Sequence, residues 1–142
     1  RGRGCRVRLA PGPPEEPRLR SALEARRAVR GVTVVTGDGS VGVRGEVADV
    51  LPEAIGRSEA AVVYAAGGVA TLHAAAAAAE AAGAWSQTAV EQPLACATGL
   101  CHGCLVPVVA ENGSPRSARA CHDGPVLRGD GVRWHDLAEG RP

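Results

Sequence analysis

The 142-residue chain contains no Phe, Met or Lys, and aromatic residues make up only 2% of it. Its core must therefore be built mainly from Ala, Val and Leu, which bury less apolar area per residue than aromatic side chains do. No run of about eighteen strongly apolar residues is present, and residues 1–8 lack the apolar segment of a signal peptide. We therefore expect a cytoplasmic protein of about one domain in length, without a membrane span.

The charges of the chain are nearly balanced. Sixteen basic residues, all Arg, oppose fifteen Asp and Glu, which gives a formal net charge of +1. No basic surplus is available to neutralise a polyanion, so binding of nucleic acid through bulk charge is not expected. The chain also begins with Arg rather than Met, which we interpret as the mark of a fragment or a processed product.

Short apolar runs alternate with helical stretches over the first part of the chain. This alternation is typical of βα units around a parallel sheet and predicts an α/β fold. A short helix is expected to be capped by Asp49, with Pro52 in its first turn, and Gly83 is expected to end an Ala-rich helix. The strands are expected at 5–9, 32–36, 61–65 and 86–90, and the longer helices at 15–29 and 69–82.

The alternation of apolar runs and helical stretches ends at Pro93. Strand-like pieces at 105–110 and 132–134 lie among Gly, Pro and Cys residues. We interpret this segment as a small lobe that is organised by something other than an apolar core. The sequence thus predicts two domains, 1–92 and 93–142.

Four of the five cysteines follow a specific spacing. Four residues separate Cys96 from Cys101, two separate Cys101 from Cys104, and sixteen separate Cys104 from Cys121. This is the plant-type spacing of a [2Fe–2S] cluster, in which three thiolates on one loop are joined by a distant fourth. Cys5 is remote in sequence, and we interpret it as an ordinary small buried residue.

The residues between these cysteines suit the same chemistry. Gly99 and Gly103 can take a positive φ and turn backbone amides toward the sulfurs, and Thr98 adds a hydroxyl donor. His102 and His122 each follow a cysteine directly. A Rieske centre would use two histidines, but four thiolates make them unnecessary, so we interpret both as spacers.

Two other interpretations of the cysteines remain open. Four thiolates also suit tetrahedral zinc, although zinc ribbons and knuckles usually present two Cys pairs of two to four intervening residues each. A disulfide framework ranks last, because no secretory signal accompanies the cysteines.

A glycine-rich loop follows the expected strand at 32–36. Gly37, Gly39 and Gly42 satisfy the G-x-G-x-x-G pattern, but Asp38 would place negative charge beside a phosphate and no helix opens directly after the loop. A surface loop or hairpin turn is at least as good an interpretation. In a milder functional interpretation, Asp38 and Ser40 contact the ribose of a nucleotide.

Gly67 and Gly68 form a second candidate nucleotide contact. They join the expected strand at 61–65 to the Ala-rich helix, whose N-terminus offers free amides. Close packing of the strand on the helix explains the two glycines as well, and spacing alone does not rank the two explanations.

Four stretches of the chain carry a resemblance: VVTGDGS at 34–40, VVYAAG at 62–67, CATGLCHGC at 96–104 and CHDGPV at 121–126. They resemble the C-terminal half of the electron-transfer subunit of type B dihydroorotate dehydrogenase, within the ferredoxin reductase-like flavoproteins. The resemblance implies a partial ferredoxin reductase-type nucleotide-binding (Rossmann-like) parallel sheet, followed by a small [2Fe–2S] cluster lobe. It also implies that the flavin-binding barrel and the first strand of the NAD-binding domain are absent.

The function that this resemblance implies is an oxidoreductase electron relay in pyrimidine biosynthesis. NADH gives a hydride to FAD, and electrons pass singly through the cluster to a partner, the dihydroorotate dehydrogenase catalytic subunit, in a heterotetramer-type assembly. The matching cluster ligands are Cys96, Cys101, Cys104 and Cys121, while Asp38 and Ser40 match the loop beside the nicotinamide nucleotide.

The chain departs from the family at two places. Ala66, Gly67 and Gly68 stand where the family usually shows Cys-Gly-Pro, and Gln92 and Pro93 replace part of the charged segment before the cluster loop. Two other functions therefore stay open: a related NAD(P)H-ferredoxin or hydrogenase-type diaphorase subunit, and a zinc-stabilised module without catalysis. No side chain is predicted to be catalytic.

Overall fold

The structure is a computed structural model that describes residues 32–141, and the chain divides into two compact units between Ala60 and Ala61. The strand expected at 5–9 and the helix expected at 15–29, together with Cys5, lie outside the described residues. The domain boundary expected after residue 92 stays a prediction. Each unit is described by itself below.

The first unit contains two very short strands and a helix. Strands β1 (Val35–Thr36) and β2 (Val43–Arg44) pair in parallel, and helix α2 follows at Val47–Ser58. The helix begins before Asp49 rather than after it, so the expected cap was misplaced. The Asp49 carboxylate instead accepts the Glu46 backbone N–H at 2.8 Å, as the acid of a capping box does. Pro52 consequently lies inside the helix.

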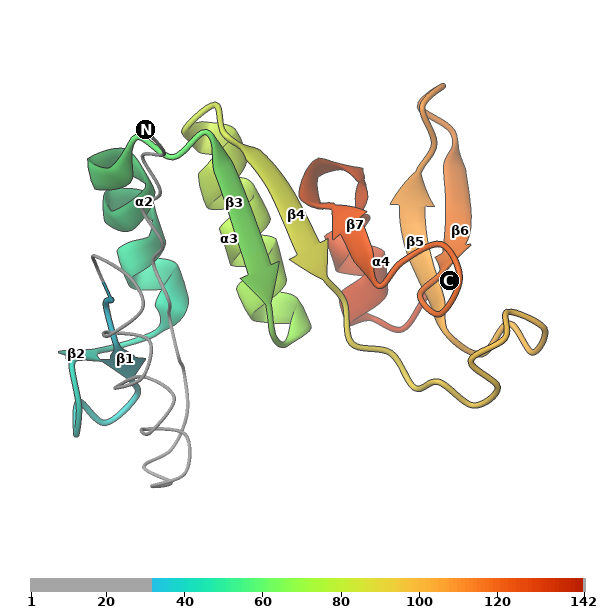
Figure 1. Ribbon diagram of the computed structural model, residues 1–142, viewed down its shortest axis with the longest axis horizontal. Coiled ribbons are helices and arrows are strands. Elements are labelled where there is room, and N and C mark those ends of the chain that lie inside the picture. Colours follow the sequence, from blue (N-terminus) through green and yellow to red (C-terminus); the bar gives the residue numbers. More distant parts are fainter. Residues whose placement is uncertain (1–31, 142) are drawn as a thin grey trace, which may run out of the picture. The chain divides into compact units, whose positions relative to one another are not determined.

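The second unit is built on a mixed three-stranded sheet (Figure 1). Strands β3 (Val62–Ala66) and β4 (Trp85–Ala89) are parallel and are joined by helix α3 (Val69–Ala81), while β7 (Val126–Arg128) pairs antiparallel with β4. The expected strands and helix agree with these to within one residue. Gly83 has a φ of +68° just beyond α3, the left-handed conformation that ends helices.

A β-hairpin carries the rest of the second unit. Strands β5 (Leu105–Val109) and β6 (Pro115–Arg119) pair antiparallel, a 3-10 turn covers Gly129–Gly131, and helix α4 spans Trp134–Ala138. The strand expected at 105–110 is confirmed. The strand expected at 132–134 is wrong, because Val132 forms only an isolated bridge with Val108 and Trp134 opens α4.

An apolar core holds this unit together, contrary to the expectation for the segment after Pro93. It joins α3 to the hairpin and to α4, and the Trp134 indole N–H donates to the buried Gly129 carbonyl at 2.9 Å. The expectation failed because the core residues are scattered along the sequence and most of them are Ala or Val. They are Leu72, Ala76, Val90, Cys104, Val106, Val108, Ala118, Ala120, Val132, Trp134 and Leu137.

The α/β class with parallel strand pairs is therefore confirmed. No helix in residues 32–141 combines the length and the apolar character that crossing a bilayer requires.

Candidate metal centre

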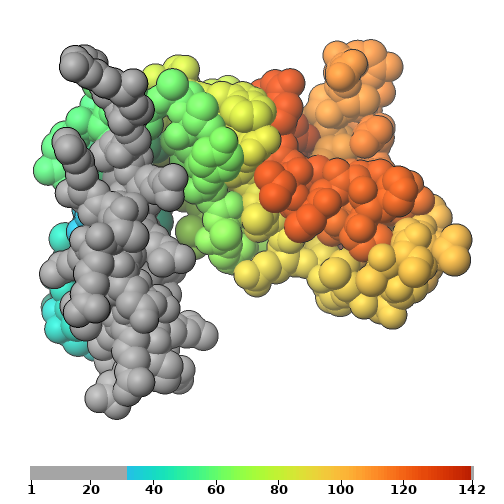
Figure 2. Space-filling view, viewed as in Figure 1, coloured from blue at the N-terminus to red at the C-terminus, as the bar shows by residue number. Residues whose placement is uncertain are grey.

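The hairpin brings the four spaced cysteines together from two segments. Cys96 and Cys101 lie in the loop between β4 and β5, Cys104 directly precedes β5, and Cys121 follows β6. The Ala120 backbone N–H donates to the Cys104 carbonyl at 2.9 Å, which extends the hairpin ladder by one step. Figure 2 shows the loop in gold packed against the orange-red segment that follows β6.

Cys96 and Cys101 form the first pair. The Cys101 backbone N–H donates to Cys96 Sγ at 3.4 Å. The Thr98 hydroxyl, the Cys101 N–H and the Thr98 N–H, in that order of effect, lower the pKa of the Cys96 thiol from 9.0 to about 5. Cys96 is therefore poised as a thiolate, the form in which cysteine binds metals. Thr98, the donor expected from the sequence, is thus the largest cause of the lowered pKa of Cys96.

Cys104 and Cys121 form the second pair. The Cys121 backbone N–H hydrogen-bonds the Cys104 thiol and lowers its pKa, and the Cys121 thiol adds to this effect. The pKa of Cys121 is raised in turn, first by its hydrogen bond to Cys104 and then by desolvation. Cys104 is only 3% exposed and belongs to the apolar core, whereas Cys101 is exposed. The four thiols thus span the distance from the core to the surface.

Three residues of the loop adopt a positive φ. Gly99 does so as expected, with φ +83°, but Ala97 at +54° and His102 at +55° do so as well. Gly103 has no positive φ, yet its N–H still donates to Cys101 Sγ at 3.4 Å. Left-handed backbone is strained for Ala and His, and such strain collects at functional sites. The residue types at Ala97 and His102 gave no indication of a left-handed backbone at these positions.

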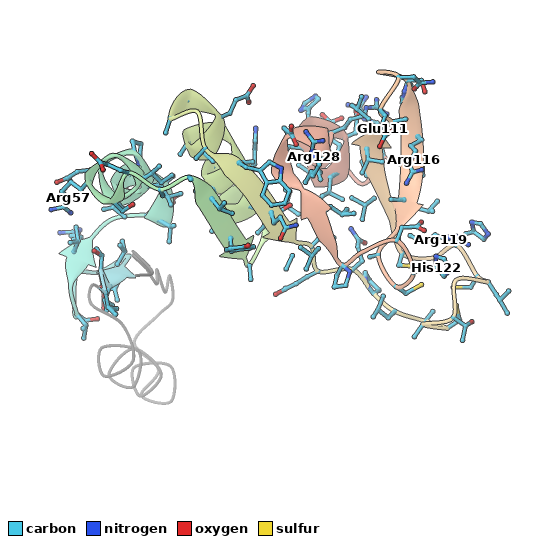
Figure 3. All side chains as sticks on the ribbon, turned by 45° about the horizontal axis from the view of Figure 1, so that its top comes forward. Arg57, Glu111, Arg116, Arg119, His122 and Arg128 are labelled. Carbon is cyan, nitrogen blue, oxygen red and sulfur yellow. The ribbon has the colours of Figure 1, made fainter. Side chains whose placement is uncertain are left out.

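Arg119 and Asp123 also border the site, and neither was predicted. The Asp123 carboxylate accepts the Arg119 backbone N–H at 2.8 Å, and this bond, His122 and the guanidinium hold the pKa of Asp123 far below its usual range. The Arg119 guanidinium reaches the Gly99 carbonyl at 3.2 Å. Figure 3 shows Arg119 and His122 beside the loop that carries the sulfur atoms. The aspartate of the CHDGPV stretch was the one signal in the sequence.

The thiols are arranged in pairs rather than around one point. Within residues 32–141, no three His, Cys, Asp or Glu side chains are grouped as a site for a single metal ion.

His102 and His122 are both exposed, and His122 also contacts Asp123 through Nδ1 at 3.0 Å.

The first candidate nucleotide loop lies in the other unit. The Asp38 carboxylate accepts the Ser40 backbone N–H at 3.0 Å, and this bond lowers the pKa of Asp38. Asp38 is thus ionised at neutral pH, which suits a ribose hydroxyl and opposes a phosphate. Gly42 has a φ of +80°, and a Cβ there would lie 2.1 Å from the Val34 carbonyl oxygen. That glycine is required by the fold of the loop.

The second candidate nucleotide contact lies at the start of α3. Gly67 has a φ of +142°, which explains the glycine there, and a Cβ on it would meet only Thr71, at 3.9 Å. A Cβ on Gly68 would meet nothing within 4 Å. Close packing of strand on helix therefore does not account for either glycine.

Residues 91–133 match a family model described as the iron-sulfur cluster binding domain of dihydroorotate dehydrogenase B. The matched range contains all four spaced cysteines, together with Arg119 and Asp123. The segment after β4 therefore has the sequence pattern of an iron-sulfur binding domain.

Curated relatives extend the similarity over most of the chain. The chain is 36% identical over 96 residues to the electron transfer subunit of dihydroorotate dehydrogenase B (NAD(+)) from Caldanaerobacter subterraneus, and the alignment covers 68% of this chain. It is 34% identical over 108 residues to the subunit of the same name from Listeria monocytogenes, with 71% of this chain covered. The alignments cover only 38% and 37% of those relatives.

One solved structure has the same fold over much of the chain. It is an NADH-dependent reduced ferredoxin-NADP oxidoreductase, described in connection with flavin-based electron bifurcation. The match has a TM-score of 0.66 and 27% sequence identity, and it covers 82% of this chain and 40% of the other. The resemblance inferred from the sequence is therefore confirmed, for a chain that spans well under half of these proteins.

Proposed function

We propose that this chain, whose C-terminal segment matches the cluster-binding domain of dihydroorotate dehydrogenase B, carries a [2Fe–2S] cluster on Cys96, Cys101, Cys104 and Cys121. One observation carries the proposal. The β5–β6 hairpin brings four thiols from two segments into two neighbouring pairs inside the range that the family model matches. Paired thiols suit this cluster, because each of its two irons takes two protein ligands.

The chain's own residues prepare the site in three ways. The Thr98 hydroxyl and the Cys101 N–H stabilise the Cys96 thiolate, so this ligand is deprotonated before metal arrives. The Gly103 N–H and the Gly99 N–H point at sulfur, where hydrogen bonds offset the negative charge of four thiolates. When bound, the cluster supplies one-electron transfer.

The exposure of the loop suits exchange of electrons with a partner. Leu100, between two of the thiols, is 83% exposed, and Cys101 is exposed as well. We therefore assign the chain to an electron-transfer subunit that relays electrons between NADH and FAD on one side and a dihydroorotate dehydrogenase catalytic subunit on the other. This relay belongs to cytoplasmic pyrimidine biosynthesis, and turnover depends on the complete subunit and its partner.

Nucleotide contacts are the second part of the proposal. The ionised Asp38 and Ser40 are suited to a ribose, and the open space over Gly68 leaves room for a ligand at the start of α3. The free amides of that helix terminus favour a negatively charged group.

Single Cys→Ser variants of the four proposed ligands test the cluster, with Cys5→Ser as the matched control. Each of the four is expected to lose most of the visible absorbance and of the EPR signal after reduction, whereas Cys5→Ser keeps both. Full signal in any one of the four variants, or loss in the control, rejects this ligand set.

A related diaphorase function is the second candidate, and the structural match to a reduced ferredoxin-NADP oxidoreductase favours it. The two functions differ in the electron acceptor. Reduction of the complete subunit by NADH, followed by mixing with either a ferredoxin or a dihydroorotate dehydrogenase catalytic subunit, separates them. Rapid oxidation by the ferredoxin alone would select the diaphorase.

A further inference from the structure

Arg119, the last residue of β6, links two segments of the cluster site that are far apart in sequence. Its Nη1 donates to the carbonyl oxygen of Gly99, twenty residues earlier, at 3.2 Å. Gly99 is buried, and within residues 32–141 its carbonyl accepts no other hydrogen bond. The guanidinium therefore satisfies a buried acceptor at the centre of the cluster loop.

Asp123 holds the guanidinium in this position. One carboxylate oxygen accepts both the Arg119 backbone N–H at 2.8 Å and the Arg119 Nε–H at 3.4 Å. The Asp123 backbone N–H donates back to the Arg119 carbonyl at 2.7 Å, which closes a tight turn around Cys121. The two side chains are only 30% and 27% exposed, so water screens the pair less than it screens a surface ion pair.

The two cysteine-bearing segments meet at this pair. Gly99 lies between Cys96 and Cys101, and Cys121 lies inside the turn that Arg119 and Asp123 close. Loss of the guanidinium would leave the Gly99 N–H to the Cys121 thiol as the remaining hydrogen bond between the loop and the turn, and would loosen the first thiol pair from the second. A positive charge at this place also favours the reduced cluster, which is more negative than the oxidised one.

We infer that Arg119 is a positioning residue for the cluster: it ties the cluster loop to the Cys121 turn, and its charge raises the reduction potential. Asp123 orients Arg119. The inference rests on the proposed function, since it concerns the same four thiols.

Three substitutions in the full chain test this role against one control. Arg119→Gln removes the charge and shortens the reach, Arg119→Lys keeps the charge without the planar fork, and Asp123→Asn weakens the hold on the guanidinium. Arg116→Gln is the control, because Arg116 is an exposed residue on the same strand and also loses one positive charge. The two readouts are the rate of cluster loss to an iron chelator and the equilibrium of reduction against a redox dye.

Arg119→Gln is expected to lose its cluster about tenfold faster than the wild type. Its equilibrium constant for one-electron reduction is expected to fall about tenfold, which corresponds to a decrease of about 59 mV in the reduction potential. Arg119→Lys is expected to lose the cluster faster while keeping the wild-type potential. Asp123→Asn is expected to lose the cluster faster than the wild type but more slowly than Arg119→Gln, and it serves as the second variant for cluster loss if Arg119→Gln does not fold. Because it removes a negative charge, it is not expected to lower the equilibrium constant for reduction. Arg116→Gln is expected to change neither readout.

Equal values for Arg119→Gln and Arg116→Gln in both readouts overturn the inference. If the wild type holds no iron and sulfide, the proposed function has failed instead. Hydrogen exchange of the amides at 99–104 then still tests the tie: faster exchange in Arg119→Gln than in Arg116→Gln supports it, and equal exchange overturns it.

Discussion

The Cys96 thiol offers a test of the cluster loop in the cluster-free chain. Its pKa of about 5, against an ordinary 9.0, means that about 99% of it is thiolate at pH 7 rather than about 1%. The Thr98 hydroxyl is the largest cause. Thr98→Val removes that donor and nearly preserves the shape of the side chain, so it is expected to move the pKa of Cys96 upward.

Alkylation with iodoacetamide between pH 4 and 10, read by peptide mass spectrometry, measures this pKa. The midpoint of the pH profile is the quantity to compare, because a low pKa also lowers the intrinsic reactivity of a thiolate. Cys121 is an internal control in the same sample. Its pKa is raised by the hydrogen bond to Cys104, so its midpoint is expected above pH 9.

The lowered pKa of Cys96 also determines how the stability of the folded chain changes with pH. Between pH 5 and pH 9 the unfolded chain binds more protons at Cys96 than the folded chain does, so this thiol contributes stability as the pH rises through that range and loses it as the pH falls toward 5. A Cys96 midpoint near pH 9 in the native chain, equal to that in urea, would refute the arrangement of donors around the thiol.

Three further substitutions test the backbone by urea unfolding. Gly42→Ala is expected to cost about 2 kcal/mol or more, because its Cβ would meet the Val34 carbonyl oxygen at 2.1 Å; full stability would contradict the loop structure. Gly99→Ala is expected to cost about 1 kcal/mol through its φ of +83°, whereas Ala97→Gly leaves stability unchanged or raised. The reverse order would show that the loop has another conformation. Gly68→Ala is expected to be neutral, since its Cβ meets open space, and a loss above about 1 kcal/mol would argue for close packing there.

Strands β3 and β4 were predictable because their signals are local, whereas the strand expected at 32–36 spans only Val35–Thr36 and pairs with Val43–Arg44, which was expected as part of a loop. The apolar residues of Val62–Ala66 predict a strand, and the Ala-rich sequence of Val69–Ala81 predicts a helix, without any information on distant contacts. The cysteine spacing is equally direct, since a cluster fixes how far apart its ligands stand in a loop.

The elements after Pro93 were harder to predict because long-range pairing determines them. Strand β6, Pro115–Arg119, has one buried residue, Ala118, so no alternation of apolar and polar residues marks it. Val132 and Trp134 alternate like a strand, but Trp134 turns into α4 and donates to Gly129. The role proposed for Arg119 depends on a contact with Gly99 across twenty residues, which no local pattern encodes.

The central claim is that the four thiols hold a [2Fe–2S] cluster. The most direct measurement is the iron, acid-labile sulfide and zinc content of the anaerobically purified chain, together with its EPR spectrum after reduction. The proposal predicts about two iron and about two sulfide per chain, with an EPR signal that appears on reduction. Stoichiometric zinc without sulfide, in a colourless protein, would contradict it.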